Sequence, residues 1–590
     1  MGTEKTSEKV SGQDVLELVA LAISYEAQNL DDKALETYEK ALAADPHSLQ
    51  ALLAIAAFQK KKDDIEKAYE YMARVFDAHP ENADAFVARG LLRFAEKARR
   101  PELADYEKAL AIDPNHREAL YNLAAAYLES SKVPAAADKV KRLKILVPQE
   151  GLVYYLEGLL RGREGRLKEE IKCYERAREL DSDMVAVHYN LGVALQEAGR
   201  AAEAIDAFRV AMELEPESLD IYLNLGSAYF DEGRNDDATT VLAKASEKFP
   251  DCVDVWYNLG YVLAASHQYD AAVEAYQKAV TIDNTMADAY YNMAFIRFKR
   301  GDYEKAIAGY QRVIELQPER FKAYYNLAFS FDRCQRYEEA IDIYKRTLTF
   351  RPDDHKTYSK LAMVYYHMKD WRKVRNASVR SLEMERVSNA EAHYYLGLVA
   401  EHEGKWEEAA EQMKSALRQE ANFKDAHIKR AAALRRLGNL EEAKLEAKEA
   451  IRQKATSSSY YELGRAYGEL GEGQKALAAF KKALEFDKDD VKSIIAVADQ
   501  FMKQKDIEGA IDTCRKSIDA GVNSYQLHYH LALALEAKGD LQESVAEGKR
   551  AAKLNKDFAP AYAVIGKAYK ALGDEQRANK YLSRYRQLKQ

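Results

Sequence analysis

The sequence predicts an all-α fold made of short helices that pair and repeat along the chain. Glycine and proline are sparse, with 27 and 11 among 590 residues, which argues against strand-and-turn architectures. Apolar residues make up 47% and charged residues 31%, as in folded, helix-rich proteins. A short motif and a proline recur every 34 residues. Because 590 residues exceed one compact core, this repetition indicates a long array of small repeats.

The prolines set the phase of the array. Eight of the eleven share one register, at multiples of 34 residues: Pro46, Pro80, Pro114, Pro148, Pro216, Pro250, Pro318 and Pro352. A proline stops a helix because it lacks a backbone N–H and its ring clashes with the preceding turn. Each of these positions is therefore predicted to end a helix.

The segment Val253–Met286 shows how one repeat is built. Apolar and small residues recur at helical spacing in both halves: Trp256, Leu259, Gly260 and Leu263, then Ala272, Tyr276 and Ala279. The small side chains at Gly260 and Ala272 allow the two predicted helices to approach closely. A glycine, which tolerates left-handed backbone, ends the first helix in many repeats: Gly199, Gly233, Gly301, Gly404, Gly438, Gly471, Gly539 and Gly573.

The pattern W-x2-L-G-x2-Y, followed by glycine, A-x3-F/Y-x2-A and proline at period 34, resembles the tetratricopeptide repeat. The resemblance covers nearly the whole chain: counted from Val15 it gives seventeen repeats, the last ending at Gln590. It implies an alpha-alpha superhelix, a right-handed solenoid of antiparallel helix pairs whose first helices line a concave groove. The third repeat (Ala83–His116) and the eleventh depart most clearly from the pattern.

The register also predicts the organisation of the chain. Residues 1–14 are polar and charged and are expected to form a disordered tail. Residues 15–386 hold repeats 1–11, and residues 387–590 hold repeats 12–17. One residue is added near Ser388 and one is missing near Ser457, and the phase proline is absent after Pro352. A softer joint is therefore expected near residues 386–389.

An asparagine in the repeated motif is the main candidate for function. It lies two residues before the small packing residue, at Asn122, Asn190, Asn224, Asn258, Asn292 and Asn326. In the tetratricopeptide family this position faces the groove, where an amide offers one acceptor and two donors to a peptide main chain. The five from Asn190 to Asn326 resemble the asparagine ladder in the repeat arm of O-linked N-acetylglucosamine transferase, although its catalytic domain is missing here. The alternative is that the asparagine is family consensus and satisfies local backbone groups.

Aromatic and basic residues accompany these amides. Three tyrosines directly precede them: Tyr257, Tyr291 and Tyr325. Three rings follow one helical turn later on the same face: Tyr261, Phe295 and Phe329. Three lysines lie just beyond: Lys322, Lys356 and Lys360. We expect a peptide-binding groove in which the lysines bind an acidic side chain or a C-terminal carboxylate, unless they are ordinary solvated charges.

Catalytic and cofactor chemistry is not expected. The chain has no Gly-rich phosphate loop, GxSxG, HExxH or CxxC motif, so we predict no enzyme activity, no cofactor, no metal and no small-molecule substrate. Its four cysteines are far apart in sequence, which favours a reducing, cytoplasmic location. A net charge of −8 argues against nucleic acid. No apolar run approaches the roughly 18 residues that a membrane span needs.

The sequence therefore predicts a protein–protein interaction scaffold or adaptor that binds an extended peptide of a partner and assists in assembling a multiprotein complex. Residues 387–590 hold 34 Lys and Arg against 31 Asp and Glu, so they are expected to offer a second, more basic surface. One alternative is a substrate-targeting arm that acts in trans with an enzyme such as a glycosyltransferase. Another is a self-associating structural protein, and the oligomeric state is left open.

Overall fold

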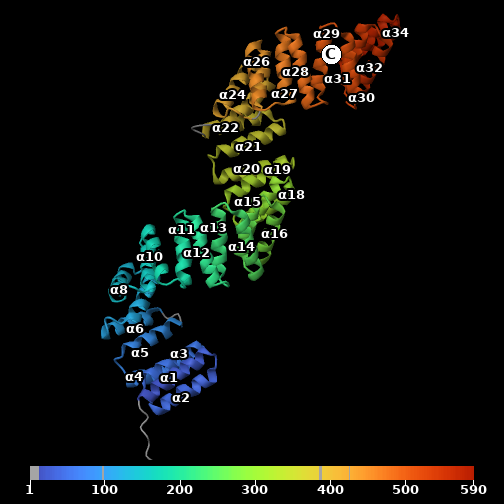
Figure 1. Ribbon diagram of the computed structural model, residues 1–590. Helices are drawn as coiled ribbons and strands as arrows, with labels where there is room; N and C mark the ends of the chain where they lie inside the picture. The colour runs from blue at the N-terminus through green and yellow to red at the C-terminus, as the bar shows by residue number, and fades with distance from the viewer. Residues whose placement is uncertain (1–11, 96–98, 385–388, 424, 590) are drawn as a thin grey trace, which may run out of the picture. The chain divides into compact units, whose positions relative to one another are not determined.

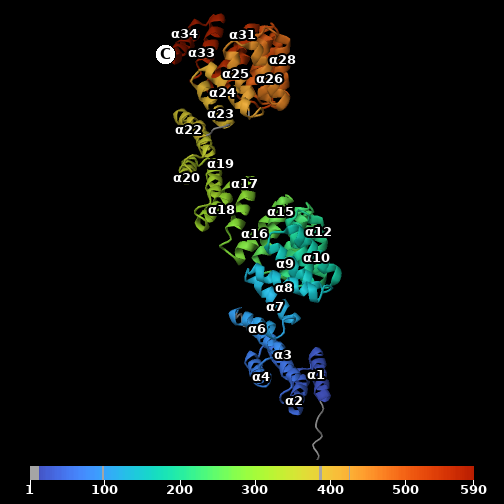
Figure 2. The same ribbon diagram turned by 90° about the vertical axis from the view of Figure 1, so that its left-hand side faces the viewer.

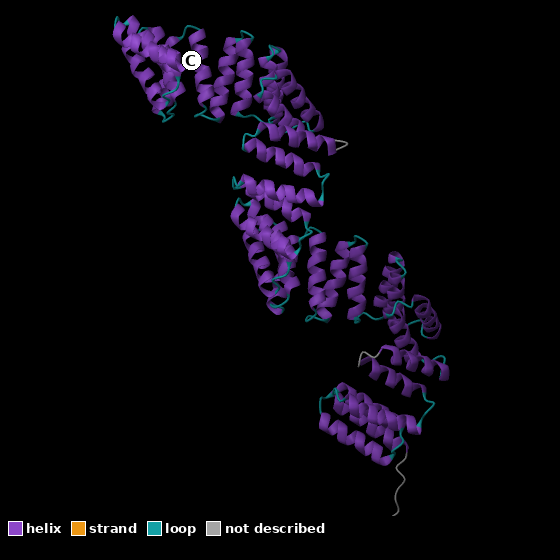
Figure 3. Ribbon diagram, turned by 180° about the vertical axis from the view of Figure 1, so that it is seen from behind, coloured by secondary structure: helices purple, strands orange, loops and turns teal. Residues whose placement is uncertain are grey.

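The computed structural model describes residues 12–95, 99–384, 389–423 and 425–589. In this part of the chain every regular element is a helix and none is a strand (Figure 3), which confirms the predicted all-α fold class. Thirty-four helices, α1 to α34, follow one another as pairs, two to each predicted repeat (Figure 1). The chain divides into an N-terminal unit, Met1–Ala289, and a C-terminal unit, Tyr290–Gln590.

The first sixteen helices are α1 (Gly12–Ala27), α2 (Asp31–Ala44), α3 (Leu49–Lys61), α4 (Ile65–Ala78), α5 (Ala83–Ala95), α6 (Arg99–Ile112), α7 (Arg117–Glu129), α8 (Val133–Leu146), α9 (Gly151–Arg163), α10 (Leu167–Leu180), α11 (Val185–Glu197), α12 (Ala201–Leu214), α13 (Leu219–Asp231), α14 (Asn235–Lys248), α15 (Val253–Ala265) and α16 (Tyr269–Ile282). The others are α17 (Ala287–Lys299), α18 (Tyr303–Leu316), α19 (Phe321–Arg333), α20 (Tyr337–Phe350), α21 (His355–His367), α22 (Trp371–Met384), α23 (Ala390–His402), α24 (Trp406–Gln419), α25 (Ala426–Arg436), α26 (Leu440–Gln453), α27 (Ser457–Glu469), α28 (Gly473–Phe486), α29 (Val491–Lys503), α30 (Ile507–Asp519), α31 (Tyr525–Lys538), α32 (Leu541–Leu554), α33 (Ala559–Ala571) and α34 (Glu575–Lys589).

Two predicted boundaries lie at the edges of the residue ranges that the structure describes. Helix α1 begins at Gly12, so residues 12–14 are helical rather than part of the expected tail, and residues 1–11 lie outside the described residues. Residues 385–388, which contain most of the joint expected near 386–389, also lie outside them. The first helix extends upstream of Val15 because Gly12–Asp14 continue the helical backbone without a proline.

Packing follows the chain order. Within each unit, the helices of a pair pack on each other, second helices pack on the first helices that follow them, and successive first helices such as α25, α27 and α29 also touch. Figures 1 and 2 show this stacking of pairs within each unit. A single pair cannot bury its apolar face alone, so the core is built between neighbouring pairs. Within each unit, contacts such as α25 with α27 and α27 with α29 place successive first helices side by side.

Particular residues produce the predicted pair geometry. A Cβ added at Gly260 would lie 2.9 Å from the ring of Tyr276, so only glycine lets α15 and α16 approach this closely. The eight loop glycines all have positive φ, as their predicted role requires. The indole of Trp256 donates to the carbonyl of Pro250 at 2.8 Å, which ties the phase proline to the following first helix.

The third repeat departs from the others by burying charge. Asp105 on α6 is bound by two arginines of α5: Arg89 Nη2 lies 2.7 Å from Oδ1, and Arg93 Nη1 lies 2.5 Å from Oδ2. The Asp105 side chain is 1% exposed. In the eighth repeat the same three positions hold the buried apolar residues Leu259, Leu263 and Ala275. An ion triad therefore replaces an apolar triad at one helix-pair interface.

Two cysteines are predicted to resist alkylation in the folded protein. Burial raises the pKa of the Cys173 thiol to about 11 and that of Cys514 to about 12. Because the folded protein favours the neutral thiol, the raised pKa of each cysteine stabilises the fold. This stabilisation is complete below the unfolded thiol pKa of about 8.5, and it is lost as the pH rises through the folded-state pKa values. Iodoacetamide labelling at about pH 8, followed by mass spectrometry, should be slow at both sites in buffer and fast in urea. Equal labelling rates in buffer and in urea would show that these two thiols are not protected by burial.

Candidate functional site

The asparagines of the repeated motif all lie on first helices, partly buried among the neighbouring repeats. The N-terminal unit holds four of them, on α7, α11, α13 and α15: Asn122, Asn190, Asn224 and Asn258. The C-terminal unit holds two, on α17 and α19: Asn292 and Asn326. Each lies two residues before a buried small residue, as predicted, so the backbone position of the amide is fixed by helix packing.

Three of these amides donate to a tyrosine of the preceding repeat. The Nδ2 of Asn224 lies 3.1 Å from the hydroxyl of Tyr189, and the Nδ2 of Asn326 lies 2.9 Å from that of Tyr291. Asn190 makes the corresponding contact with Tyr155 at 3.4 Å. The partner always lies 35 residues earlier. These bonds therefore join consecutive first helices.

A second bond fixes the orientation of two amides. The Nδ2 of Asn190 donates to the carbonyl of Ala186, and that of Asn224 donates to the carbonyl of Asp220, both at 2.8 Å. A carbonyl only accepts, so the nitrogen must face it and the amide oxygen points elsewhere. Within the described residues, the Oδ1 of Asn190 and Asn224 has no hydrogen-bond partner. Each of these amides thus keeps one acceptor for a ligand.

The partner tyrosines remain neutral. Burial raises the pKa of Tyr155 and Tyr189, and the donated hydrogen bond from the asparagine only partly offsets this effect. Burial likewise raises the pKa of Tyr291, against the nearby Arg320 and the bond from Asn326. A neutral phenol retains its O–H donor. Each Tyr–Asn pair therefore combines a hydroxyl donor with an amide acceptor.

Two of the other predicted amides have no tyrosine 35 residues earlier. The residue 35 positions before Asn258 is Leu223, and that before Asn122 is Val87, so neither has a phenol to bind. Within the described ranges, the side chains of Asn122 and Asn258 make no hydrogen bond. Asn292 is partly buried on α17. The regularly spaced amides therefore lie in more than one local environment.

Most of the predicted aromatic rings pack within the array. The three rings that precede the amides lie 5.6–5.9 Å from second-helix tyrosines of the same repeat, in the pairs Tyr257–Tyr276, Tyr291–Tyr310 and Tyr325–Tyr344. Tyr261 is 48% exposed beside Phe230, and Phe295 is 42% exposed. Phe329 packs on Phe298. The exposed aromatic surface is therefore concentrated at Tyr261 in one unit and Phe295 in the other.

The three predicted lysines differ in availability. Lys322 and Lys356 are exposed at the starts of α19 and α21. Lys360 is partly buried, and its Nζ lies 2.9 and 3.0 Å from the two carboxylate oxygens of Glu391. A ligand carboxylate would have to displace Glu391 there. The sequence did not reveal this pairing because the two residues lie in different repeats.

Histidines of the array also have partners of their own. His528 pairs with Glu547 at 2.6 Å, and the nearby His530 pairs with Asp499 at 2.9 Å. No group of three or more His, Cys, Asp or Glu residues in the described part of the chain is arranged to hold a metal ion. Among the helices described, none is both long and apolar enough to cross a membrane.

Sequence reasoning missed two features of the site. The Tyr–Asn pairing has a readable signal, since tyrosine and asparagine recur 35 residues apart, one more than the repeat length. A second feature, a series of cavities along α25, α27 and α29, has no motif. It arises between neighbouring repeats, where side chains of helices α25 to α29 and their loops meet.

Comparisons with known sequences identify the repeat. Family profiles described as tetratricopeptide repeat match residues 17–50, 95–150, 155–218, 223–287, 285–353, 361–425 and 457–490. A "TPR repeat-containing protein" of Treponema pallidum (strain Nichols) is 36% identical over 106 residues. That match covers 17% of this chain and only 12% of the relative.

Solved structures with similar helix pairs have low overall similarity. MamA is 24% identical, with a TM-score of 0.28, over 30% of this chain and 96% of that chain. The APC/C hetero-tetramer Cut9-Hcn1 is 14% identical, with a TM-score of 0.36, over 89% and 97%. YrrB, described as a TPR protein with an unusual peptide-binding site, is 23% identical, with a TM-score of 0.29, over 31% and 95%.

With every TM-score below 0.5, no functional conclusion for this chain follows from those structures. The family profiles, in contrast, together match more than half of the chain. Thirty-four described helices arranged as successive pairs agree with them. The chain belongs to the tetratricopeptide repeat family.

Proposed function

We propose that this protein-interaction scaffold binds an extended segment of a partner protein along its first helices, through the Tyr–Asn pairs. The observation that carries the proposal is the fixed amide of Asn190 and Asn224, whose oxygen is left without a partner in the described part of the chain. A peptide group offers one N–H and one C=O. A pair that presents an amide acceptor beside a hydroxyl donor is complementary to it.

Main-chain binding of this kind has low sequence selectivity. Each hydrogen bond contributes about 0.5–1.5 kcal/mol net, so a few of them give weak binding before ordering costs. Exposed rings and cations must add affinity, and Tyr261, Phe295, Lys322 and Lys356 are the predicted contributors. A scaffold that holds one segment this way can keep its partner in a larger complex, which is the assembly role we assign to it.

The test is affinity capture from native lysate with three full-length baits. One is the natural chain, and one has alanine at Asn190, Asn224, Asn258, Asn292 and Asn326. The third replaces Asn376 and Asn579, which are exposed on second helices, and serves as the matched control. We expect a partner that is retained by the first and third baits and lost from the second, and a peptide from it that binds the second bait at least tenfold more weakly.

Circular dichroism and thermal melting must show that the five-alanine variant remains folded. Because three of its asparagines also join repeats, a small loss of stability is expected. Retention of the same partners with the same affinity by all three baits would contradict the proposal. The Tyr–Asn bonds would then serve only to hold the repeats together.

A further inference from the structure

Three adjoining cavities follow the first helices α25, α27 and α29 of the C-terminal unit, away from the asparagines. Their volumes are about 400, 360 and 240 Å³. The first two share Asp425 and Ile428, and the last two share Tyr461 and Lys492. They therefore form a continuous groove that spans three repeats.

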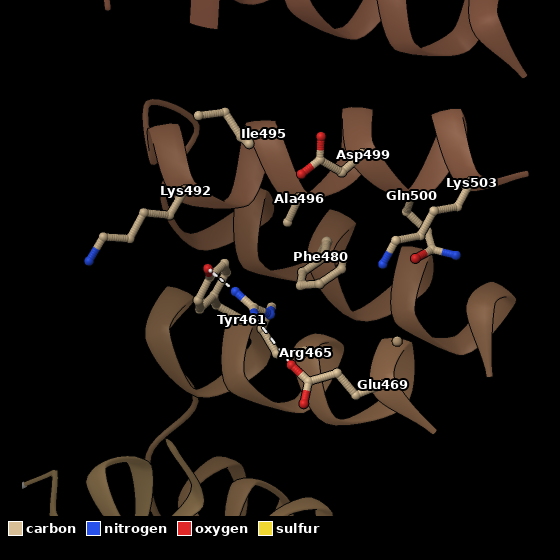
Figure 4. A pocket seen from close by; sticks show the side chains of 11 residues that line it. Tyr461, Arg465, Glu469, Phe480, Lys492, Ile495, Ala496, Asp499, Gln500 and Lys503 are labelled. Carbon is tan, nitrogen blue, oxygen red and sulfur yellow. Dashed lines mark hydrogen bonds and ion pairs between the residues drawn. The ribbon is translucent and has the colours of Figure 1, made fainter. Parts of the chain in front are cut away.

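The cavity at α27 and α29 is lined by apolar side chains, by cations and by two carboxylates (Figure 4). Phe480, Ile495 and Ala496 supply its apolar lining. Lys492 and Lys503 come from the two ends of α29 and are labelled on opposite sides of the cavity in Figure 4. Apolar side chains together with cations at both ends suit a short peptide segment that carries carboxylates.

The carboxylates of this cavity already have partners. Glu469 Oε1 accepts from Arg435 at 2.7 Å and from Arg465 at 3.2 Å. Asp499 pairs with His530 at 2.9 Å. The Nζ atoms of Lys492 and Lys503, in contrast, have no ion pair or hydrogen bond within the described ranges. The cavity thus contains positive charge that its own acids do not neutralise.

Arg465 is held in place between these lysines. Its Nη1 donates to the hydroxyl of Tyr461 at 3.2 Å, and its Nη2 donates to Glu469. A guanidinium has five N–H donors, so these two contacts orient the group and leave others for a ligand. Both partners lie on α27, the same rigid helix, which keeps the arginine directed across the cavity.

We propose that this cavity binds acidic side chains of an extended peptide from a partner protein, with Arg465 at its centre and Lys492 and Lys503 at its two ends. The adjoining cavity is lined by five carboxylates: Glu401, Asp425, Glu462, Asp487 and Asp490. It repels a continuous phosphate backbone, so the complementary ligand is a peptide with a local acidic group rather than a nucleic acid. The site does not depend on the Tyr–Asn pairs.

The experiment is a selection of twelve-residue peptides from a random displayed library on the full chain. It is repeated on Lys492→Glu/Lys503→Glu and on the charge-matched control Lys553→Glu/Lys580→Glu, whose lysines are exposed on second helices. A fourth target is the five-alanine asparagine variant. We expect enrichment of Asp and Glu on all targets except Lys492→Glu/Lys503→Glu, because only that variant replaces the two unpaired lysines of the cavity with acids.

A selected peptide is then measured by fluorescence anisotropy. It should lose at least tenfold in affinity for Lys492→Glu/Lys503→Glu, and again when its acidic residue is replaced by the isosteric amide. The altered lysines are exposed, so both charge variants should melt like the natural chain. Absence of acidic enrichment on the natural chain, equal affinity for both charge variants, or stronger binding of a single-stranded oligonucleotide would overturn the proposal.

Discussion

Replacing Arg89 and Arg93 with alanine is expected to destabilise the third repeat by about 3–5 kcal/mol. Both arginines bind Asp105, whose side chain is 1% exposed, and their loss leaves that carboxylate buried without a cation. The Arg89 guanidinium also lies 4.1 Å from the centre of the Phe76 ring, so some packing is lost with it. Hydrogen exchange followed by mass spectrometry of α5 and α6 measures the effect locally, since a long array does not unfold in one step.

The control is the apolar triad of the eighth repeat. The variant Arg89→Leu/Arg93→Leu/Asp105→Ala reproduces Leu259, Leu263 and Ala275, and it should be as stable as the natural chain or more stable. The two arginine-free variants differ in whether a buried carboxylate remains and in the size of the side chains at positions 89 and 93. If both exchange equally fast, the loss comes from arginine packing and not from the unpaired charge.

Tyr344→Ala is expected to cost about 3–5 kcal/mol, whereas Tyr344→Phe should be neutral or slightly stabilising. The Tyr344 ring is fully buried, and its removal leaves a cavity between α19, α20 and α21. Its hydroxyl, in contrast, has no hydrogen-bond partner in the described part of the chain. Burial holds the pKa of this phenol well above its usual value, so it stays neutral and needs no counter-ion. Hydrogen exchange of α19 to α21 gives both results.

The matched control is Tyr38, which occupies the same position in the first repeat. Its ring is 1% exposed, but its hydroxyl donates to Glu26 at 3.1 Å. Tyr38→Phe should therefore lose about 0.5–1.5 kcal/mol, while Tyr344→Phe does not. A similar loss at both positions would mean that the Tyr344 hydroxyl has a bound partner, such as water.

The period of 34 predicted most of the fold. Prolines, loop glycines and the close approach at Gly260 act through backbone geometry, which is local and can be read from one repeat. The partners of individual side chains are less predictable. Lys360 and Glu391 look like two solvated charges in sequence, and only the stacking of two repeats brings them within 3.0 Å.

In the candidate site too, backbone positions could be predicted from the sequence, whereas side-chain partners could not. The positions of the asparagines followed from the register, but their bonds to tyrosine required the distance between successive first helices. The cavity bordered by Lys492 and Lys503 depends on which carboxylates are already paired, for example Asp499 with His530 of the next repeat. Pairings between repeats decide which charges remain available, and a sequence pattern does not encode them.

The Tyr–Asn bond has a mechanical consequence. The amide that offers its oxygen to a ligand is the same group that links its repeat to the preceding one, as at Asn224 and Tyr189. A peptide segment bound across successive amides would stabilise those links between repeats. Binding of the peptide and stiffness of the array would therefore be thermodynamically coupled. Tension that opens these links would then favour release of the ligand.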